Sequence, residues 1–284
     1  MLPSPVGSQA TPRYWSLAAG PKLAAHVVCF WAQAFEPGRT RSRYALYPDG
    51  CSRLLFSVNT GVQLIGPHTD PVVSWADGEI LLGIRLRPGI APALLGISGT
   101  DMLNRTFARE KKLGGFESTL VKLFSSSDPI QAKLLMLRTM AGERLVQAEA
   151  QDPVILKSVE MIANTPSISI NEIAETLDVS SRHLQRRFRS ATGYGPKTFS
   201  RLIRFQRLLS LTNTTGGSSS NLASLAVEAG YSDQSHMTRE VRVIAKCRPT
   251  EILDDLKSTF FVSDSFKTDI YSPPILPGLA ISSQ

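Results

Sequence analysis

The stretches INEIAETLDVSSRHLQRRF (residues 170–188) and LASLAVEAGYSDQSHMTREV (residues 222–241) repeat one pattern. Each starts with a short helical run around a central alanine, passes through a tight turn and a serine, and ends in a second helical run. The repeated apolar positions are Ile173, Ala174, Leu177, Leu184 and Phe188 in the first copy, and Leu225, Ala226, Ala229, Met237 and Val241 in the second. Two helices joined by a short turn form a helix-turn-helix unit, whose second helix can enter a DNA major groove. We therefore predict two such units, at 170–190 and 222–245, with turns at Asp178 and Gly230.

The segment between the two units, GPKTFSRLIRFQRLLSL (195–211), reads as one continuous helix. Such a helix is about 24 Å long at 1.5 Å per residue. With the widths of the units added, it can hold the second helices apart by close to one turn of B-DNA, roughly 34 Å. One chain could then read two successive major-groove segments.

Positive charge gathers in the same region. The chain carries a net charge of +7, and residues 180–212 hold eight Arg or Lys and no Asp or Glu. A basic block on helices is either a solvated face or a phosphate-binding surface. A module that binds RNA or an acidic protein stays open as an alternative to a DNA reader.

Three motifs carry a resemblance to a known family. They are S-x-x-H-L-x-R-x-F at 180–188, G-x-x-P at 193–196, and A-x-x-x-G-Y-x-D-Q-S-H at 226–236, followed by Arg239 and Pro249. The region 151–257 resembles the DNA-binding domain of AraC/XylS-type bacterial transcription regulators. Members of that family usually have Phe where Val241 stands and Gly where Lys246 stands, so the second unit is expected to pack less tightly at its end.

The resemblance and the side-chain chemistry together imply a set of DNA contacts. Arg pairs with guanine and Gln with adenine, whereas phosphate contacts position the protein without specifying sequence. The predicted base-reading residues are Arg182, Gln185, Arg186, Gln234, Ser235 and Arg239. The predicted phosphate contacts are Ser181, Arg189, Lys197, Arg201, Thr238 and Arg242, with Arg204 as a further candidate. Ser232 is predicted to be the N-cap of the second reading helix, with Asp233 in its first turn.

The N-terminal part has a different texture. Short apolar runs between turn residues over 14–100 predict an antiparallel β sandwich or cupin-like barrel. The runs YPDGCSRLLF and GIRLRPGIAPALLGI resemble an uncharacterised β-rich domain that precedes this DNA-binding module in some regulators. The predicted fold class is thus α+β, with a flexible tail at 1–13, a sensor domain at 14–100, a helical linker or dimerisation region at 101–150, and a C-terminal tail at 258–284.

Candidate ligand groups in the sensor domain have more than one interpretation. Aromatic residues there could line a pocket or form the core: Trp15, Phe30, Trp31, Phe35, Tyr44, Tyr47 and Trp75. Four arginines could bind an acidic effector, lie on the surface or form ion pairs: Arg43, Arg53, Arg85 and Arg87. The resemblance implies control by a small-molecule effector or by dimerisation, and contact with RNA polymerase if the protein is an activator.

Other classes of function are disfavoured. No run of 18 apolar residues and no secretory signal is present, which predicts a cytoplasmic protein with no membrane contact. The three cysteines and four histidines are scattered, which predicts neither a disulfide framework nor a metal site, and no cofactor is expected. Ser235 and His236 are neighbours on a helix and diverge by about 100°, so we expect no catalytic residue there. A cupin-like metal enzyme with a DNA-targeting domain remains as an alternative.

Overall fold

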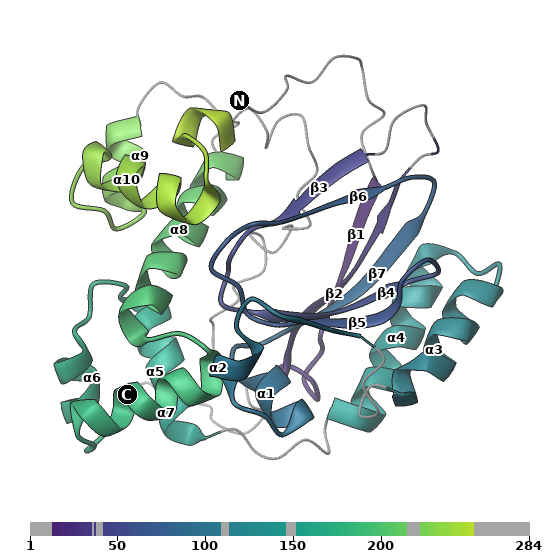
Figure 1. Ribbon diagram of the computed structural model, residues 1–284, viewed down its shortest axis with the longest axis horizontal. Helices are drawn as coiled ribbons and strands as arrows, with labels where there is room; N and C mark the ends of the chain where they lie inside the picture. The colour runs from purple at the N-terminus through teal and green to yellow at the C-terminus, as the bar shows by residue number, and fades with distance from the viewer. Residues whose placement is uncertain are drawn as a thin grey trace, which may run out of the picture.

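The computed structural model describes residues 13–35, 37, 42–108, 114–145, 152–214 and 222–252. Within these ranges an N-terminal part built on β-sheet is followed by a helical C-terminal part (Figure 1), which confirms the predicted α+β class. The predicted C-terminal tail and most of the predicted N-terminal tail lie outside the described residues.

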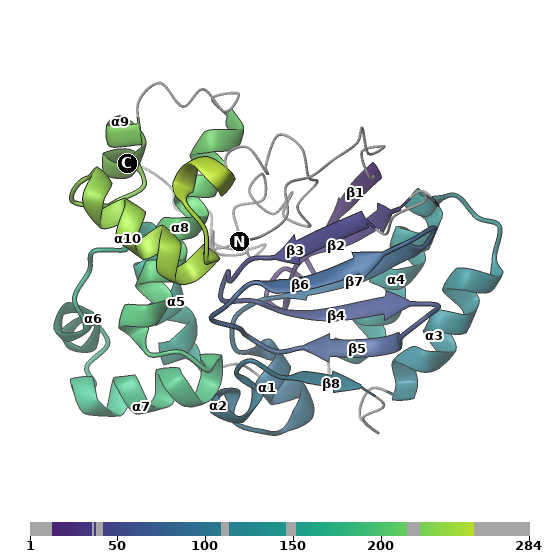
Figure 2. The same cartoon turned by 45° about the horizontal axis from the view of Figure 1, so that its top comes forward.

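The described residues of the N-terminal part contain eight strands: β1 (Arg13–Ala18), β2 (Val27–Ala34), β3 (Ser42–Leu46), β4 (Ser52–Ser57), β5 (Gly61–Ile65), β6 (Val72–Ala76), β7 (Ile80–Leu86) and β8 (Thr106–Ala108). The main sheet has the order β1-β2-β7-β4-β5-β8, and β3 pairs with β6 in a separate ribbon. All neighbours are antiparallel. The predicted antiparallel β domain is therefore present as two sheets (Figure 2).

The main sheet is buried on both faces. One face packs against α4 (Ile130–Leu145), with Phe30, Leu54 and Leu137 in the shared core. The opposite face forms a smaller core with the β3–β6 ribbon, including Trp31 and Leu46. Because both faces are covered, the central strands β2, β4 and β7 are buried almost throughout, and their burial does not alternate.

The region expected to be a helical linker, 101–150, also contributes to the sheet. The prediction that this region is wholly helical is wrong at β8, which pairs with the edge strand β5. A three-residue strand shows too little periodicity to be recognised from sequence. In the chain, α1 (Ile90–Leu95) and α2 (Gly99–Met102) precede β8, and α3 (Gly114–Ser125) and α4 follow it. Leu134 and Leu137 of α4 pack against the core of the main sheet.

The C-terminal part, as far as it is described, contains the helices α5 (Pro153–Asn164), α6 (Ile170–Thr176), α7 (Ser181–Thr192), α8 (Pro196–Thr214), α9 (Leu222–Glu228) and α10 (Gln234–Ala245). The helix α8 has 19 residues and connects the α6–α7 pair to the α9–α10 pair (Figure 1). It is about 28 Å long at 1.5 Å per residue. The ten repeated apolar positions of the two units all pack in or against one core, with Leu177 half-buried.

The two parts of the chain meet along α8 and the turn that precedes it. The Tyr194 hydroxyl donates to the carbonyl of His68 over 2.7 Å, and the Gln206 amide donates to the carbonyl of Pro48 over 2.7 Å. Gly50 lies against Phe199 so closely that a Cβ at position 50 would overlap the ring. The β domain and the helical part are therefore docked through buried, specific contacts.

A buried ionic cluster lies beside this interface. Asp49 forms ion pairs with Arg53 and, over 2.6 Å, with Arg85, and all three side chains are at most 2% exposed. Burial tends to raise the pKa of Asp49, but the two guanidinium groups outweigh it and hold that pKa below its usual value. Arg53 and Arg85 are thus in ion pairs, which was one of the interpretations considered, and they are not surface residues.

The remaining candidate ligand groups of the β domain differ in how deeply they are buried. Phe30, Trp31, Phe35 and Tyr47 are core residues, as the more conservative interpretation held. Half-buried Trp15 packs against the core, and Arg87 donates to the carbonyl of Ala24, whereas Trp75 is 56% exposed. The side chains of Arg43 and Tyr44 lie outside the described residues.

We predict that Asp49→Asn destabilises the protein by about 3–5 kcal/mol at pH 7, because two buried guanidinium groups lose their carboxylate. The carboxylate contributes stability above about pH 4, the ordinary Asp pKa, and loses it as the pH falls through the lowered pKa of the folded state. The difference in free energy of unfolding between the wild type and the variant, measured by urea unfolding, should therefore become smaller below about pH 4.

Asp70→Asn is the matched control for this prediction. Asp70 pairs with Lys246 over 2.6 Å, but the Asp70 side chain is 60% exposed. An exposed ion pair contributes about 0–1 kcal/mol. Equal losses in the two variants would contradict a structural role for the Asp49 cluster.

Candidate nucleic-acid interface

The two helix-turn-helix units have equivalent turns. Asp178 and Gly230 both adopt the left-handed conformation, with φ of 49° and 92°. The amide that follows each of them, at Val179 and Tyr231, donates to the carbonyl of the central alanine, Ala174 or Ala226. This closing hydrogen bond is typical of a helix that ends in a left-handed residue. The predicted repeat thus extends to backbone hydrogen bonds.

The N-cap of the second reading helix differs from the prediction. The cap is Asp233, not Ser232: a carboxylate oxygen of Asp233 accepts from the amide of His236 over 2.7 Å. In the first unit Ser180 accepts in the same way from the amide of His183 over 3.2 Å. The second turn contains one more residue, which moves the cap from the serine to the aspartate. The hydrogen bond from the His236 amide, with help from the Ser232 hydroxyl, lowers the pKa of Asp233.

The first reading helix, α7, exposes a basic face. Arg182, Gln185, Arg186 and Arg189 are all exposed, while Leu184 and Phe188 on the opposite face are fully buried. Ser181 is half-buried, and its hydroxyl donates to the side chain of Asn171 over 2.7 Å. The four exposed residues therefore lie together on one accessible surface of the helix.

The second reading helix, α10, exposes Gln234, Ser235, Arg239 and Arg242, while Thr238 is half-buried. When the two caps are aligned, Arg186 corresponds to Arg239 and Gln185 to Thr238. The extra turn residue thus puts Thr238, predicted as a phosphate contact, at the position that corresponds to a predicted base-reading residue. Gln234 corresponds to Ser181.

The residues predicted on α8 fall into two groups. Lys197 is exposed. Arg201 and Arg204 instead pair with Glu240 of α10, over 2.7 Å and 3.2 Å. Arg204 also lies over the ring of Tyr231, 5.7 Å from its centre. Arg201 and Arg204 thus brace the second reading helix against α8.

Glu240 is the functional residue that the sequence interpretation missed. It lies on α10 and neutralises arginines of a block that contains no acidic residue of its own. Its signal in the sequence is a single acid on a helix whose other charged residues are arginines, but a partner far away in the chain cannot be identified from that signal. In α7 the corresponding residue, Arg187, pairs with Asp152 over 2.5 Å.

The serine and histidine at the start of α10 have structural roles. The Nδ1 of His236 lies 3.0 Å from the Ser232 hydroxyl, and its ring packs edge-on against Tyr231, so His236 belongs to the capping turn. Among the described residues no group of three His, Cys, Asp or Glu side chains is placed to hold a metal ion. No helix in the described part of the chain is long and apolar enough to cross a membrane.

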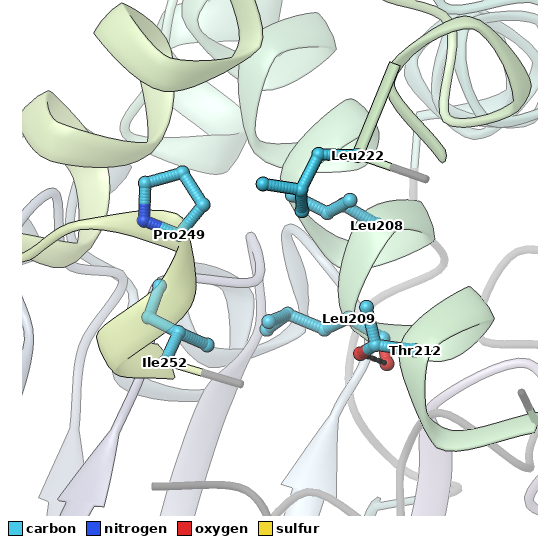
Figure 3. A pocket seen from close by; sticks show the side chains of 6 residues that line it. All are labelled: Leu208, Leu209, Thr212, Leu222, Pro249 and Ile252. Carbon is cyan, nitrogen blue, oxygen red and sulfur yellow. Dashed lines mark hydrogen bonds between the residues drawn. The ribbon is translucent and has the colours of Figure 1, made fainter. Parts of the chain in front are cut away.

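A small hollow lies in the second unit, between α8, α9 and the helical turn at 249–252. Figure 3 shows Leu208, Leu222, Pro249 and Ile252 around it. Its volume is about 10 Å³ and its walls are apolar, so it has no room for a ligand.

Val241, where looser packing was expected, is fully buried.

We predict that Asp233→Ala lowers the thermal midpoint more than Ser232→Ala does, because only Asp233 satisfies the free amide in the first turn of α10. Differential scanning fluorimetry on the full chain measures both variants. A larger loss in Ser232→Ala would support the cap that the sequence suggested.

Comparison with known proteins agrees with this geometry. Residues 173–255 match a family described as a helix-turn-helix domain, and residues 16–108 match a domain family of unknown function, DUF6597. No significant match to a curated protein is found.

The chain is also similar to several solved structures. ToxT from Vibrio cholerae is 10% identical, with 86% of this chain and 97% of that chain covered and a TM-score of 0.43. ToxT in an unsaturated fatty acid-bound form is 11% identical, with 86% and 92% covered and a TM-score of 0.43. A probable AraC family transcriptional regulator from Rhodopseudomonas palustris is 22% identical, with 38% and 100% covered and a TM-score of 0.33.

These TM-scores are low, so the assignment rests on the domain matches and on the duplicated units. The chain carries the DNA-binding helix-turn-helix domain of AraC-type transcription regulators, preceded by a β-rich domain of the DUF6597 family.

Proposed function

We propose that this protein reads two successive major-groove segments of double-stranded DNA, one with α7 and one with α10. The observation that carries the proposal is the equivalence of the two units, down to their caps and turn hydrogen bonds. Each unit presents an arginine at the same position, Arg186 or Arg239, and both side chains are exposed. Arginine in this setting can bond the O6 and N7 atoms of guanine.

The contacts divide by position on the helices. We propose that the base-reading residues are Arg182, Gln185, Arg186, Gln234, Ser235 and Arg239. Phosphate contacts are proposed for Ser181, Arg189, Lys197, Thr238 and Arg242. Arg201 is better suited to hold α10 through Glu240 than to bind phosphate, because a phosphate contact would require that ion pair to break.

The spacing of the two units supports simultaneous reading. The helix α8 is about 28 Å long, and the widths of the flanking units bring the separation toward the roughly 34 Å of one B-DNA turn. Glu240 fixes the second reading helix to α8 through two arginines. A pre-set spacing reduces the ordering cost of binding both segments together.

The second part of the proposal is that the β domain controls DNA binding. We infer that an effector or partner acts by changing how this domain docks on the helical part, through the contacts of Tyr194, Gln206 and Phe199. Selection of bound fragments from genomic DNA, with and without candidate metabolites, tests operator and effector together. Equal affinity for single-stranded RNA and selected DNA would overturn the proposal.

We predict that Arg186→Ala and Arg239→Ala each weaken binding to a selected site by about 1–3 kcal/mol and relax sequence preference at one position. Lys197→Ala should weaken binding to all sequences alike and reduce the slope of log K against log salt by about 0.9. Fluorescence anisotropy at fixed salt measures both effects.

The control for these variants is Lys122→Ala, which removes an exposed cation from α3 in the N-terminal part. It should leave the affinity and the salt slope unchanged. Unchanged affinity in both arginine variants would show that α7 and α10 are not the reading helices.

A further inference from the structure

A pocket of about 360 Å³ lies between the β domain and the first reading helix. One wall consists of Arg182, Gln185, Arg186 and Arg189 of α7, and the other contains Ser98 and Thr100 at the start of α2. Figures 1 and 2 both show α2 beside the C-terminal end of α7. The pocket therefore includes residues from both halves of the chain.

Close backbone packing joins the start of α2 to the end of α7. Gly99 and Gly193 touch so tightly that a Cβ on Gly99 would lie 2.5 Å from the amide nitrogen of Gly193. The Ser98 hydroxyl lies 3.5 Å from both the carbonyl and the hydroxyl of Ser190. The pocket thus exists only while α2 is docked on α7.

A second contact joins the two halves at the other reading helix. Lys246, at the end of α10, pairs with Asp70 over 2.6 Å. The loop that carries Asp70 is joined to the end of α2, because the Thr69 amide donates to Asn104 over 2.8 Å. One connected part of the β domain therefore reaches the C-terminal ends of both reading helices.

The lining of the pocket indicates the class of ligand. It combines three guanidinium groups with an amide and hydroxyls, and includes neither an apolar side chain nor a carboxylate. Within the described ranges no carboxylate pairs with Arg182, Arg186 or Arg189. The volume suits a small molecule. Arginine forks bind phosphate oxygens through paired, charge-assisted hydrogen bonds.

We propose that this pocket binds a small, hydrophilic anion that carries phosphate groups. The ligand would join α2 to α7 and would occupy the arginines that otherwise contact DNA. Binding of the ligand would therefore exclude binding of DNA, and binding of DNA would exclude the ligand. The competition with DNA rests on the proposed function of α7, whereas the anion site itself stands on the pocket alone. A hydrocarbon acid suits the pocket less well, because no apolar side chain lines it.

The test uses the full chain and pyrophosphate as the probe, titrated by calorimetry at constant ionic strength set with sodium chloride. Thr100 is exposed and belongs to the β-domain wall, outside the proposed DNA contacts. Thr100→Val should weaken pyrophosphate binding about tenfold, since it removes a hydrogen bond to a charged group. Thr100→Ser should restore it, and Thr60→Val, in an exposed hairpin turn, should have no effect.

DNA binding provides the second measurement. Without pyrophosphate, Thr100→Val should bind the selected DNA as the wild type does. With pyrophosphate, the DNA affinity of the wild type should fall more than that of Thr100→Val. Arg186→Ala should lose affinity for both ligands.

Three outcomes would overturn the proposal: no pyrophosphate binding at constant ionic strength, equal binding by wild type and Thr100→Val, or equally tight binding of citrate, which would remove the preference for phosphate. Failure of the wild type to bind any selected DNA would instead contradict the proposed function. Pyrophosphate binding by calorimetry would still decide the anion site in that case.

Discussion

The arrangement of the two halves depends on the ion pairs that the buried carboxylate of Asp49 forms with Arg53 and Arg85. Arg53 and Arg85 lie directly opposite each other on β4 and β7, where two like charges destabilise a sheet. Asp49 lies between them and is buried with them. The loop that supplies Asp49 also carries Pro48 and Gly50, which contact α8. Neutralising the arginine pair therefore also sets where the DNA-binding part docks.

A second ion-pair cluster has the same role within the DNA-binding part. Glu240 joins α10 to two arginines of α8, and Asp152 joins α5 to Arg187 of α7. The basic block is thus divided by tertiary contacts into arginines that hold the helices in place and arginines that stay exposed. The total charge indicates an affinity for phosphate. Only this division shows which arginine side chains are exposed and can contact a phosphate group.

The two departures from the family pattern have different consequences. Val241 is fully buried and belongs to the core of the DNA-binding part, so the smaller side chain keeps its inward position. Lys246 ends α10 in the left-handed conformation, with φ of 59°, where a side chain costs about 1–2 kcal/mol relative to glycine. Its ammonium group reaches Asp70 of the β domain. The lysine thus replaces a favourable helix end with a contact between the two halves.

The sequence by itself determined the elements that depend on local pattern: the duplicated helix pairs, the long helix between them, the apolar core positions and the exposed basic face of α7. These follow from helical periodicity and turn chemistry, which act over a few residues. The tertiary structure alone decided the Asp49 cluster, the partners of Glu240, the strand β8 and the pocket between α2 and α7. Each of these depends on the meeting of residues that are distant in the chain, or on a pairing too short to leave a periodic signal. The cap at Asp233 lies between the two cases, because one extra residue in a turn changes a local hydrogen bond without changing the surrounding pattern.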